Sequence, residues 1–301
     1  MVQGIGDDCA VLRVGSGRQL LVTTDLCMEN VHFRRDWHSP RSVGHRCLAR
    51  GLSDIAAMGG QPLACFLSLG LPTDVSQRWI NGFMAGLERL ARRFRVSLAG
   101  GDISSAPAIV ADIIVVGQVP SGQAVLRSGA RPGDRIYVTG ELGASGAVLQ
   151  RLYSGERVRP GTSKRHFFPE PRVQPGQWLR QRGRVRSMID VSDGLSVDLL
   201  HICEESGVSA VINADAVPVA RSASLDLALN SGDDYELLFT AGRGSRIPAR
   251  IGSLPIHEIG VIQKVSTKPA ITMVDARGKS QPLKQGGWQH FRDNRGLGEK
   301  E

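Results

Sequence analysis

The chain has 301 residues, which suggests about two domains of roughly 150 residues each. Hydrophobic residues make up 41% of it and charged residues 22%, a balance typical of a globular protein with a core and not of a disordered or fibrous chain. No apolar run approaches the roughly 20 residues that span a bilayer, and the first residues lack the basic start and apolar middle of a signal peptide. We therefore expect a cytoplasmic protein with no membrane partner.

The formal net charge of +8 favours anionic partners. Aromatic residues total only 5%, so we interpret the basic runs at residues 91–95 and 180–186 as solvated faces and not as a nucleic-acid groove. The five cysteines are widely spaced and form no C-x-x-C pair, which excludes a zinc ribbon or a disulfide scaffold and predicts buried free thiols.

The first half of the chain alternates predicted strands and helices. Residues 19–24 predict a strand, and Ser39-Pro40 predicts the start of a helix that ends near Met58, where Gly59-Gly60 supplies a left-handed stop. A short apolar run between two prolines predicts a buried strand at 63–71. A second helix is expected from Asp74, with Trp79, Phe83, Leu87, Leu90 and Phe94 on one core-facing side. Strands at 96–102, ending in a glycine turn, and at 109–119 follow.

Residues 120–134 are rich in Pro, Gly and Ser and predict a domain boundary. We therefore divide the chain into an N-terminal domain of residues 1–125 and a C-terminal domain of residues 126–301. The second half again mixes the two element types, with strands near 135–139 and 235–241 and a strand, loop and helix over 187–207. Mixed elements in both halves predict an α/β to α+β fold.

Familiar nucleotide-binding motifs are missing from the sequence. There is no G-x-x-x-x-G-K-[ST] loop, the glycines of residues 140–146 are wrongly spaced for a dinucleotide loop, and the protein-kinase motifs are absent. What recurs is aspartate beside small residues at the ends of predicted elements: Asp7, Asp8, Asp25, Asp54, Asp102, Asp190 and Asp193. Each one alone could cap a helix or close a turn. Together they are hard oxygen ligands suited to Mg²⁺, with neighbouring glycines that let the backbone approach phosphates.

Seven segments in this order resemble the family of bacterial thiamine-monophosphate kinases, which belongs to the superfamily of aminoimidazole-ribonucleotide synthetase and selenophosphate synthetase. They are GIGDDCAVL, LLVTTDLCMENVHF, LSDIAAMGGQPLACFLSLGLP, LAGGD, LRSGARPGDRIYVTGELG, MIDVSDGLSVDLLHI and SGDDYELLFT. The resemblance covers nearly the whole chain. It implies an N-terminal α/β domain that forms a homodimer through its sheet, a C-terminal α+β domain, and an active site between the two.

The resemblance also implies an activity and a set of site residues. The activity is phosphoryl transfer from ATP to thiamine monophosphate, assisted by several Mg²⁺ ions and giving thiamine diphosphate and ADP. The implied metal ligands are Asp8, Thr23, Thr24, Asp25, Asp54, Asp102, Asp190 and Asp193. The implied ATP contacts are Gly101, Arg127 and Ser192, and the implied substrate contacts are His32, Asp233 and Trp288.

The chemistry suits these residue types. The nucleophile is a phosphate oxygen that is mostly ionised at pH 7, so no general base is expected, and the obstacle is repulsion between two anions that metal ions relieve. Adjacent strand residues face opposite ways, so of Asp7 and Asp8 we choose Asp8 as the ligand. Trp288 and Asp233 are reasonable partners for the aminopyrimidine and the cationic thiazolium ring.

One departure from the family pattern is Ser231, which stands where glycine is common and matters only if the backbone there needs a positive φ. Two other functions are open on the residues alone. One is another ATP-dependent reaction of the superfamily, either a cyclase or a selenophosphate synthesis, although the absence of lysine before Lys164 disfavours the latter. The other is a basic nucleic-acid-binding protein without catalysis, whose affinity would fall steeply with salt.

Overall fold

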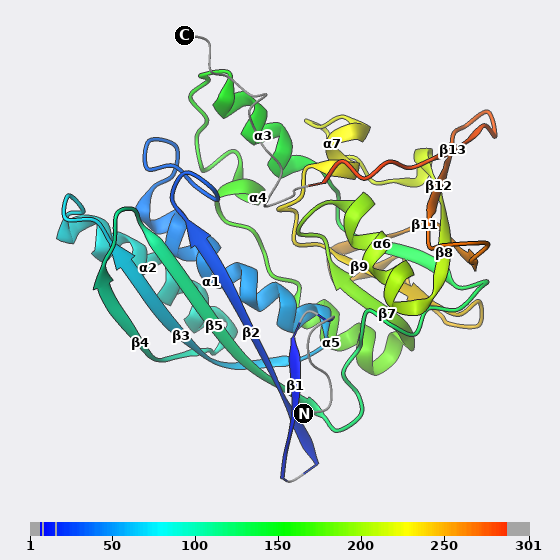
Figure 1. Ribbon diagram of the computed structural model, residues 1–301, viewed down its shortest axis with the longest axis horizontal. Helices are drawn as coiled ribbons and strands as arrows, with labels where there is room; N and C mark the ends of the chain where they lie inside the picture. The colour runs from blue at the N-terminus through cyan, green and yellow to red at the C-terminus, as the bar shows by residue number, and fades with distance from the viewer. Residues whose placement is uncertain (1–6, 8, 16, 288–301) are drawn as a thin grey trace.

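The computed structural model describes residues 7, 9–15 and 17–287. Two domains lie side by side, each built on one sheet (Figure 1). The N-terminal domain comprises β1 (Ala10–Val14), β2 (Arg18–Met28), α1 (Pro40–Ala57), β3 (Gln61–Leu71), α2 (Gln77–Phe94), β4 (Ser97–Ser105) and β5 (Val110–Pro120). Its five strands follow the order β1-β2-β5-β3-β4, antiparallel except for the parallel pair β3 and β4.

The C-terminal domain has a larger mixed sheet. Its helices are α3 (Ala144–Tyr153), α4 (Lys164–Phe167), α5 (Val173–Trp178), the π-helical turn Leu179–Gly183, α6 (Leu195–Ser206), the 3₁₀ turn Ala214–Ala216 and α7 (Leu225–Asn230). Its strands are β6 (Arg135–Thr139), β7 (Val185–Asp190), β8 (Val208–Asn213), β9 (Leu237–Ala241), β10 (Arg250–Ile251), β11 (Leu254–Lys264), β12 (Ile271–Val274) and β13 (Ser280–Pro282). The sheet order is β13-β12-β8-β11-β6-β9-β7, with β10 beside β11.

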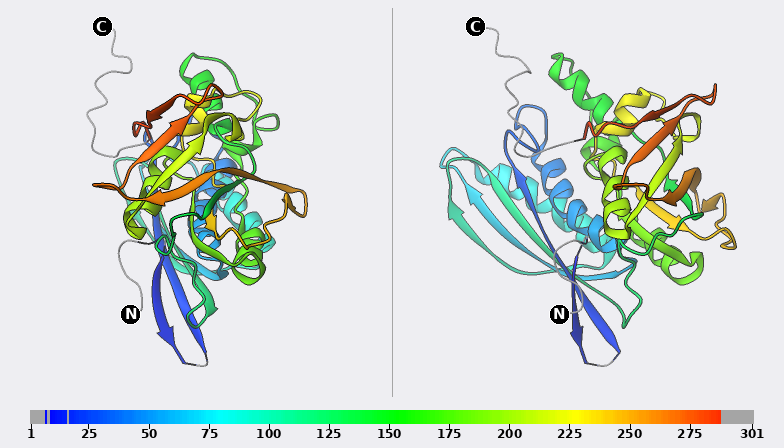
Figure 2. Two further views of the ribbon diagram at one scale, coloured as in Figure 1. Left: turned by 90° about the vertical axis from the view of Figure 1, so that its right-hand side faces the viewer. Right: turned by 45° about the vertical axis from the view of Figure 1, so that its right-hand side comes forward.

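Helix α1 is the central element of the molecule. The side chain of Ser39 accepts the backbone N–H of Ser42 at its start, and Gly59 adopts φ 65° just beyond its end, so the predicted start and stop signals are confirmed. A Cβ on Gly44 would lie 2.0 Å from the carbonyl oxygen of Phe83, so this glycine allows α1 and α2 to pack closely. The right-hand view of Figure 2 shows α1 between the five-stranded sheet and the C-terminal domain.

The helix is buried almost all round, because it packs on the sheet with one side and on the C-terminal domain with the other. The core of the N-terminal domain therefore continues into the other domain, where Leu179, Met188 and Phe239 belong to the same apolar cluster. A second core lies between the larger sheet and α6. All five cysteines lie among the described residues and are buried thiols outside any disulfide, as predicted. Within the described part of the chain, no helix is long and apolar enough to cross a bilayer.

The predicted two-domain mixed fold is confirmed. The predicted strands and helices agree with observed ones within a few residues, except that β4 does not stop at the glycines but runs through Gly100 and Gly101 to Ser105. Several further elements, among them β8, α5 and α7, were not predicted. A Cβ on Gly101 would lie 1.9 Å from the carbonyl oxygen of Leu67 in β3, so the glycine permits close strand pairing where a turn was predicted.

Candidate functional site

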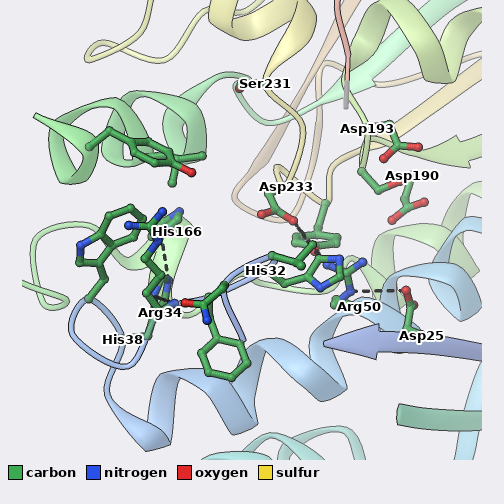
Figure 3. Close-up of a pocket in the computed structure, with 18 of the residues that line it drawn as sticks. Asp25, His32, Arg34, His38, Arg50, His166, Asp190, Asp193, Ser231 and Asp233 are labelled. Atoms are coloured by element: carbon green, nitrogen blue, oxygen red, sulfur yellow. Dashed lines mark hydrogen bonds and ion pairs between the residues drawn. The ribbon is translucent and has the colours of Figure 1, made fainter. Parts of the chain in front are cut away.

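A cavity of about 250 Å³ opens where the two domains meet (Figure 3). It is lined by the end of β2, the loop that follows it, α1, α3, α4, the loop between β7 and α6, and the loop before β9. Seven of the predicted site residues line this cavity: Asp25, His32, Asp54, Asp190, Ser192, Asp193 and Asp233. The structure therefore brings together carboxylates that are up to 208 positions apart in the sequence, from Asp25 to Asp233.

Asp190 and Asp193 are held by the polypeptide around them. Asp190 ends β7, and its Oδ2 accepts a hydrogen bond of 2.5 Å from Ser53 Oγ on α1, across the domain interface. The following loop is fixed by Asp198 of α6, whose Oδ2 accepts the backbone N–H groups of residues 192, 193 and 194 at 3.0–3.2 Å. Burial raises the pKa of Asp198, and the nearby carboxylates of Asp190 and Asp193 raise it further.

The N-terminal domain contributes Asp25 and Asp54. Thr23 Oγ1 donates to Asp54 Oδ2, and Arg50 Nε lies 3.4 Å from Asp25 Oδ1. Burial raises the pKa of Asp25 in spite of the Arg50 charge. A further cation beside Asp25 would therefore favour its ionised form. The oxygen donors of this set are those that Mg²⁺ prefers, so their chemistry fits a magnesium site. Among the described residues, however, no three His, Cys, Asp or Glu side chains are gathered closely enough to hold a metal ion by themselves.

Two other predicted metal ligands lie on the opposite face of the five-stranded sheet. In β2, Thr23 and Asp25 pair with the buried residues Val115 and Ile113 on the helix side, whereas Thr24 points away from the helices. Thr24 Oγ1 donates to Asp112 Oδ1 at 2.7 Å on that open face. Asp102 faces the same side of the sheet as Asp112. It pairs in register with Ser68 of β3, and Ser68 in turn pairs with Asp112 of β5. It lies three strands away from β2, so one chain does not place Thr24 or Asp102 in the cavity.

Of the three predicted ATP contacts, one lines the cavity and two lie outside it. Ser192 lines the cavity, but Gly101 lies in β4 on the sheet, and Arg127 lies in the connection between the domains. The backbone N–H of Arg127 donates to the carboxylate of Asp7 at 3.2 Å, so Asp7 ties the N-terminal strand region to this connection. Asp8 and Trp288, which the sequence also nominated, lie outside the described residues.

The loop before β9 carries unusual backbone geometry. Gly232, Asp233 and Tyr235 all have φ between 52° and 66°, a region that side-chain-bearing residues rarely adopt. Ser231 has φ −87°, so serine fits there without strain. The backbone N–H groups of Asp233 and Tyr235 donate to the carbonyls of Ser192 and Val191, at 2.8 and 2.9 Å, which fixes this loop against the one that carries Asp193.

The Asp233 carboxylate joins the two domains electrostatically. Arg46 Nη2 lies 2.7 Å from its Oδ2, Arg50 Nη1 lies 3.8 Å from its Oδ1, and the Tyr235 hydroxyl donates to it at 2.6 Å. Burial by itself would raise the pKa of Asp233, but the two guanidinium charges outweigh burial and hold the pKa well below its usual range. Neighbouring Asp234 behaves in the opposite way: burial raises its pKa to about 7, although its Oδ2 accepts the N–H of Gly143 at the start of α3.

Sequence reasoning missed most of the cations and aromatic residues of this cavity. Arg34, Trp37, His38, Arg50, Tyr153, His166 and Tyr235 all line it. Arg46, Arg50 and His38 lie within or beside the helix predicted from Ser39-Pro40 to Met58, in which only Asp54 was assigned to the site. The available signal was the spacing of charge: Arg46, Arg50 and Asp54 follow one another at intervals of four residues, which predicts one charged side of that helix.

Comparisons with known proteins agree with this architecture. The chain matches the family models of the AIR synthase related protein, N-terminal domain, over residues 6–119 and C-terminal domain over residues 131–248. It is 35% identical to the thiamine-monophosphate kinase of Bacillus subtilis, over 96% of this chain and 93% of that protein. It is 36% identical to the thiamine-monophosphate kinase of Escherichia coli K12, over 96% and 91% of the two chains.

A solved structure described as AaThiL complexed with AMPPCP and TMP superposes with a TM-score of 0.85 at 30% identity, over 95% of this chain and 92% of that one. Hydrogenase maturation protein HypE in complex with ATP superposes with a TM-score of 0.74 at 17% identity, over 92% and 88%, which shows a shared fold alone. The resemblance found in the sequence is therefore confirmed, and the chain belongs to the thiamine-monophosphate kinase family.

Proposed function

We propose that this protein transfers a phosphoryl group from ATP to thiamine monophosphate, giving thiamine diphosphate and ADP. The observation that carries the proposal is the convergence of Asp25 and Asp54 from one domain with Asp190 and Asp193 from the other in a single cavity. Membership of the kinase family favours this reaction over a cyclase or a selenophosphate synthesis. It also favours it over nucleic-acid binding, which would not require these carboxylates to meet.

The carboxylates of the cavity are proposed to hold Mg²⁺, with Asp25, Asp54, Asp190 and Asp193 as ligands from this chain and Asp8 as a further ligand predicted from sequence. Bound magnesium would neutralise the phosphates of both substrates and stabilise the charge on the transferred group. The loop fixed by Asp198 positions Asp193 and Ser192, and the bond from Ser53 positions Asp190. Positions fixed before substrate arrives reduce the reorganisation that the reaction requires.

His32 and Asp233 are proposed to orient thiamine monophosphate between the metal ligands and the rest of the cavity. The backbone N–H of Met28 donates to His32 Nδ1 at 3.0 Å, so the proton of this imidazole lies on Nε2, which can donate to a phosphate oxygen. Asp233 keeps a negative charge, which suits the cationic thiazolium. His38 and His166 are poor candidates for a general base, because burial lowers their pKa values to about 3 and about 2 and their ring nitrogens already bond each other.

The test is direct. Purified protein with ATP, Mg²⁺ and thiamine monophosphate should form thiamine diphosphate and ADP in equal amounts, measured by chromatography of both products. If ADP forms with another substrate of the superfamily and no thiamine diphosphate appears, the alternative reaction holds. If neither product forms at any Mg²⁺ concentration and the protein instead binds nucleic acid with a steep salt dependence, the kinase proposal is wrong.

We further propose a homodimer formed through the open face of the five-stranded sheet. Leu26 and Phe66 are 48% and 38% exposed there, and such apolar exposure on a sheet face is typical of an interface. This arrangement would let Asp102 and Thr24 serve a site completed by the partner, since neither reaches the cavity of its own chain. The predicted contacts of Gly101 and Arg127 with ATP remain part of this proposal.

The proposed dimer can be tested by complementation. Asp102→Asn and Asp193→Asn should each be nearly inactive. Co-expressed together, they should regain about a quarter of the wild-type activity, because half of the random dimers are mixed and each mixed dimer holds one intact site. If the mixture stays as inactive as its parents, Asp102 does not act across an interface.

A further inference from the structure

The cavity has two chemically different ends. Figure 3 shows Asp25, Asp190 and Asp193 at one end and Arg34, His38 and His166 at the other, with His32, Arg50 and Asp233 between them. Trp37, Leu149 and Tyr153 complete the lining of the cavity. The carboxylate end suits phosphates and metal ions, but nothing in that chemistry explains the aromatic residues.

Arg34, Trp37 and Tyr153 form a defined arrangement. The guanidinium carbon of Arg34 lies 4.4 Å from the ring centroid of Trp37 and 5.4 Å from that of Tyr153, and the two rings meet edge to face with centroids 5.0 Å apart. Among the residues that the structure describes, no carboxylate pairs with the Arg34 guanidinium. Its planar set of N–H donors is therefore held by two aromatic faces and stays available to a ligand in the cavity.

The arrangement is assembled from both domains and is rigidly supported. Trp37 belongs to the N-terminal domain but packs on a small apolar cluster of the C-terminal domain formed by Val148, Leu152 and Phe167. Next to it, a chain of hydrogen bonds crosses the same boundary: His38 Nε2 lies 3.1 Å from His166 Nε2, and His166 Nδ1 lies 2.9 Å from Ser145 Oγ. The backbone N–H of Arg34 donates to His38 Nδ1, so His38 donates to His166, which in turn donates to Ser145.

This end of the cavity selects a particular ligand chemistry. The exposed part of the Tyr153 ring favours contact with a flat ring, and the Arg34 guanidinium, which has no carboxylate partner among the described residues, favours ring nitrogens that accept hydrogen bonds. A cationic ring would be repelled by Arg34 and belongs nearer to Asp233. A neutral aminopyrimidine meets these requirements, because it is flat and presents ring-nitrogen acceptors.

We propose that Trp37, Tyr153 and Arg34 form the subsite for the aminopyrimidine ring of the substrate, the two aromatic rings contacting its face or edge and Arg34 donating to a ring nitrogen. This inference rests on the proposed kinase function. It places the phosphate at the carboxylate end, the thiazolium beside Asp233 and the aminopyrimidine at the aromatic end. It also assigns specificity to residues that the sequence motifs do not include.

The central experiment compares two substrates and two variants. Tyr153 is 59% exposed, so Tyr153→Ala is expected to fold, and Tyr153→Phe keeps the ring as a matched control. With thiamine monophosphate, Tyr153→Ala should lower kcat/KM about 10-fold through KM, leaving the KM for ATP unchanged, and Tyr153→Phe should change little. With an N-methylthiazolium phosphate, which lacks the aminopyrimidine, Tyr153→Ala and wild type should be equal. An equal loss on both substrates would overturn the subsite.

Arg34 gives a second measure of the same subsite. Arg34→Met removes the donors but keeps an unbranched chain over Trp37, and we expect kcat/KM for thiamine monophosphate to fall about 10-fold and that for the thiazolium phosphate to rise or stay constant. A fall on both substrates would instead indicate that Arg34 contacts the phosphate, contrary to the proposal.

A binding measurement separates this inference from the proposed activity. Titration of 4-amino-2-methylpyrimidine should quench tryptophan fluorescence in wild type and in Trp79→Phe, but not in Trp37→Phe. The result decides the subsite even if wild type forms no thiamine diphosphate, which would overturn only the kinase proposal. If the quenching survives in Trp37→Phe and is lost in Trp288→Phe, the ring binds at the residue nominated by sequence and our assignment is wrong.

Discussion

The two faces of the five-stranded sheet differ in what covers them. The helix side is covered by α1 and, beyond it, by the C-terminal domain, and it carries Thr23 and Asp25 into a region of buried charge. The opposite side exposes Leu26 and Phe66 and carries Thr24 and Asp102. Strand alternation thus divides one short motif, Thr23-Thr24-Asp25, between two surfaces. Residues on the helix side line a cavity within one chain, whereas the exposed apolar residues on the open side are suited to contact a second chain.

The largest effect is expected at the pocket. Asp193→Asn keeps the size of the side chain but removes a charge proposed to bind magnesium, so kcat should fall about 1,000-fold, equivalent to about 4 kcal/mol in the activation barrier. The measurement is steady-state formation of thiamine diphosphate with saturating substrates. Asp215→Asn, an exposed aspartate in the 3₁₀ turn Ala214–Ala216, serves as the control and should retain wild-type kcat. Equal rates for the two variants would exclude Asp193 as a metal ligand.

The next largest effect is expected on the free energy of unfolding, at the buried ion pair of Arg46 and Asp233. Arg46 is 2% exposed and forms an ion pair with Asp233, so Arg46→Leu leaves that carboxylate with the Tyr235 hydroxyl and the more distant Arg50. We expect the free energy of unfolding to fall by about 3 kcal/mol in urea titrations. The exposed pair of Arg93 and Glu170 provides a matched comparison, and Arg93→Leu should lower it by less than about 1 kcal/mol. Similar losses for both would mean that the buried network does not stabilise the domain interface.

Much of the scaffold could be predicted because its signals are local. Ser39-Pro40 and Gly59 fixed the ends of α1, and alternating or apolar runs located β2, β3 and β5. The glycines of β4 were misinterpreted as a turn, because their reason is the approach of β3, a contact between segments about 34 residues apart. Local patterns contain no information about such a contact.

The site was predicted only in part, for the same reason. Predicted residues within the quoted motifs, such as Asp54 and Asp193, lie in the cavity. Alternation along the strand could have shown that Thr24 faces away from Thr23 and Asp25, but it was applied only to Asp7 and Asp8. The place of Asp102 depends on the pairing of β4 with β3, which local patterns do not give. Arg34, Trp37 and His166 were not predicted either, since the loop of Arg34 and Trp37 meets His166 and the apolar cluster under Trp37 only when the two domains dock.

On the helix side of the sheet, where the two domains meet, the contribution of His45 to the free energy of unfolding should be lost at acid pH. His45 Nε2 donates to the Pro169 carbonyl at 2.8 Å across the domain boundary, and burial lowers the pKa of His45 to about 4. The unfolded chain, with a His pKa near 6.5, binds a proton first as pH falls, so stability present above pH 6.5 is lost between about pH 6.5 and 4.

For this one group the loss of unfolding free energy between pH 7.5 and pH 5 is about 2 kcal/mol. His45→Gln keeps an N–H donor and cannot titrate, so the difference between its urea midpoints at the two pH values should be smaller than that of wild type. An unchanged pH dependence in the variant would show that His45 is already solvated and protonated in the folded protein.

The smallest change in the unfolding free energy of a single chain is expected for a substitution on the open face of the five-stranded sheet. The same substitution tests whether this face forms the dimer interface. Leu26 contributes apolar surface there without a covering helix, so Leu26→Lys should change the unfolding free energy of one chain by only about 0.5 kcal/mol. The same charge would be buried in a dimer formed through this face, and the variant should therefore sediment as a monomer where wild type sediments as a dimer. Tyr153→Lys, a comparably exposed position on the other domain, should remain dimeric. A Leu26→Lys protein that stays dimeric would place the interface elsewhere, and Asp102 would then need a role other than completing a partner's site.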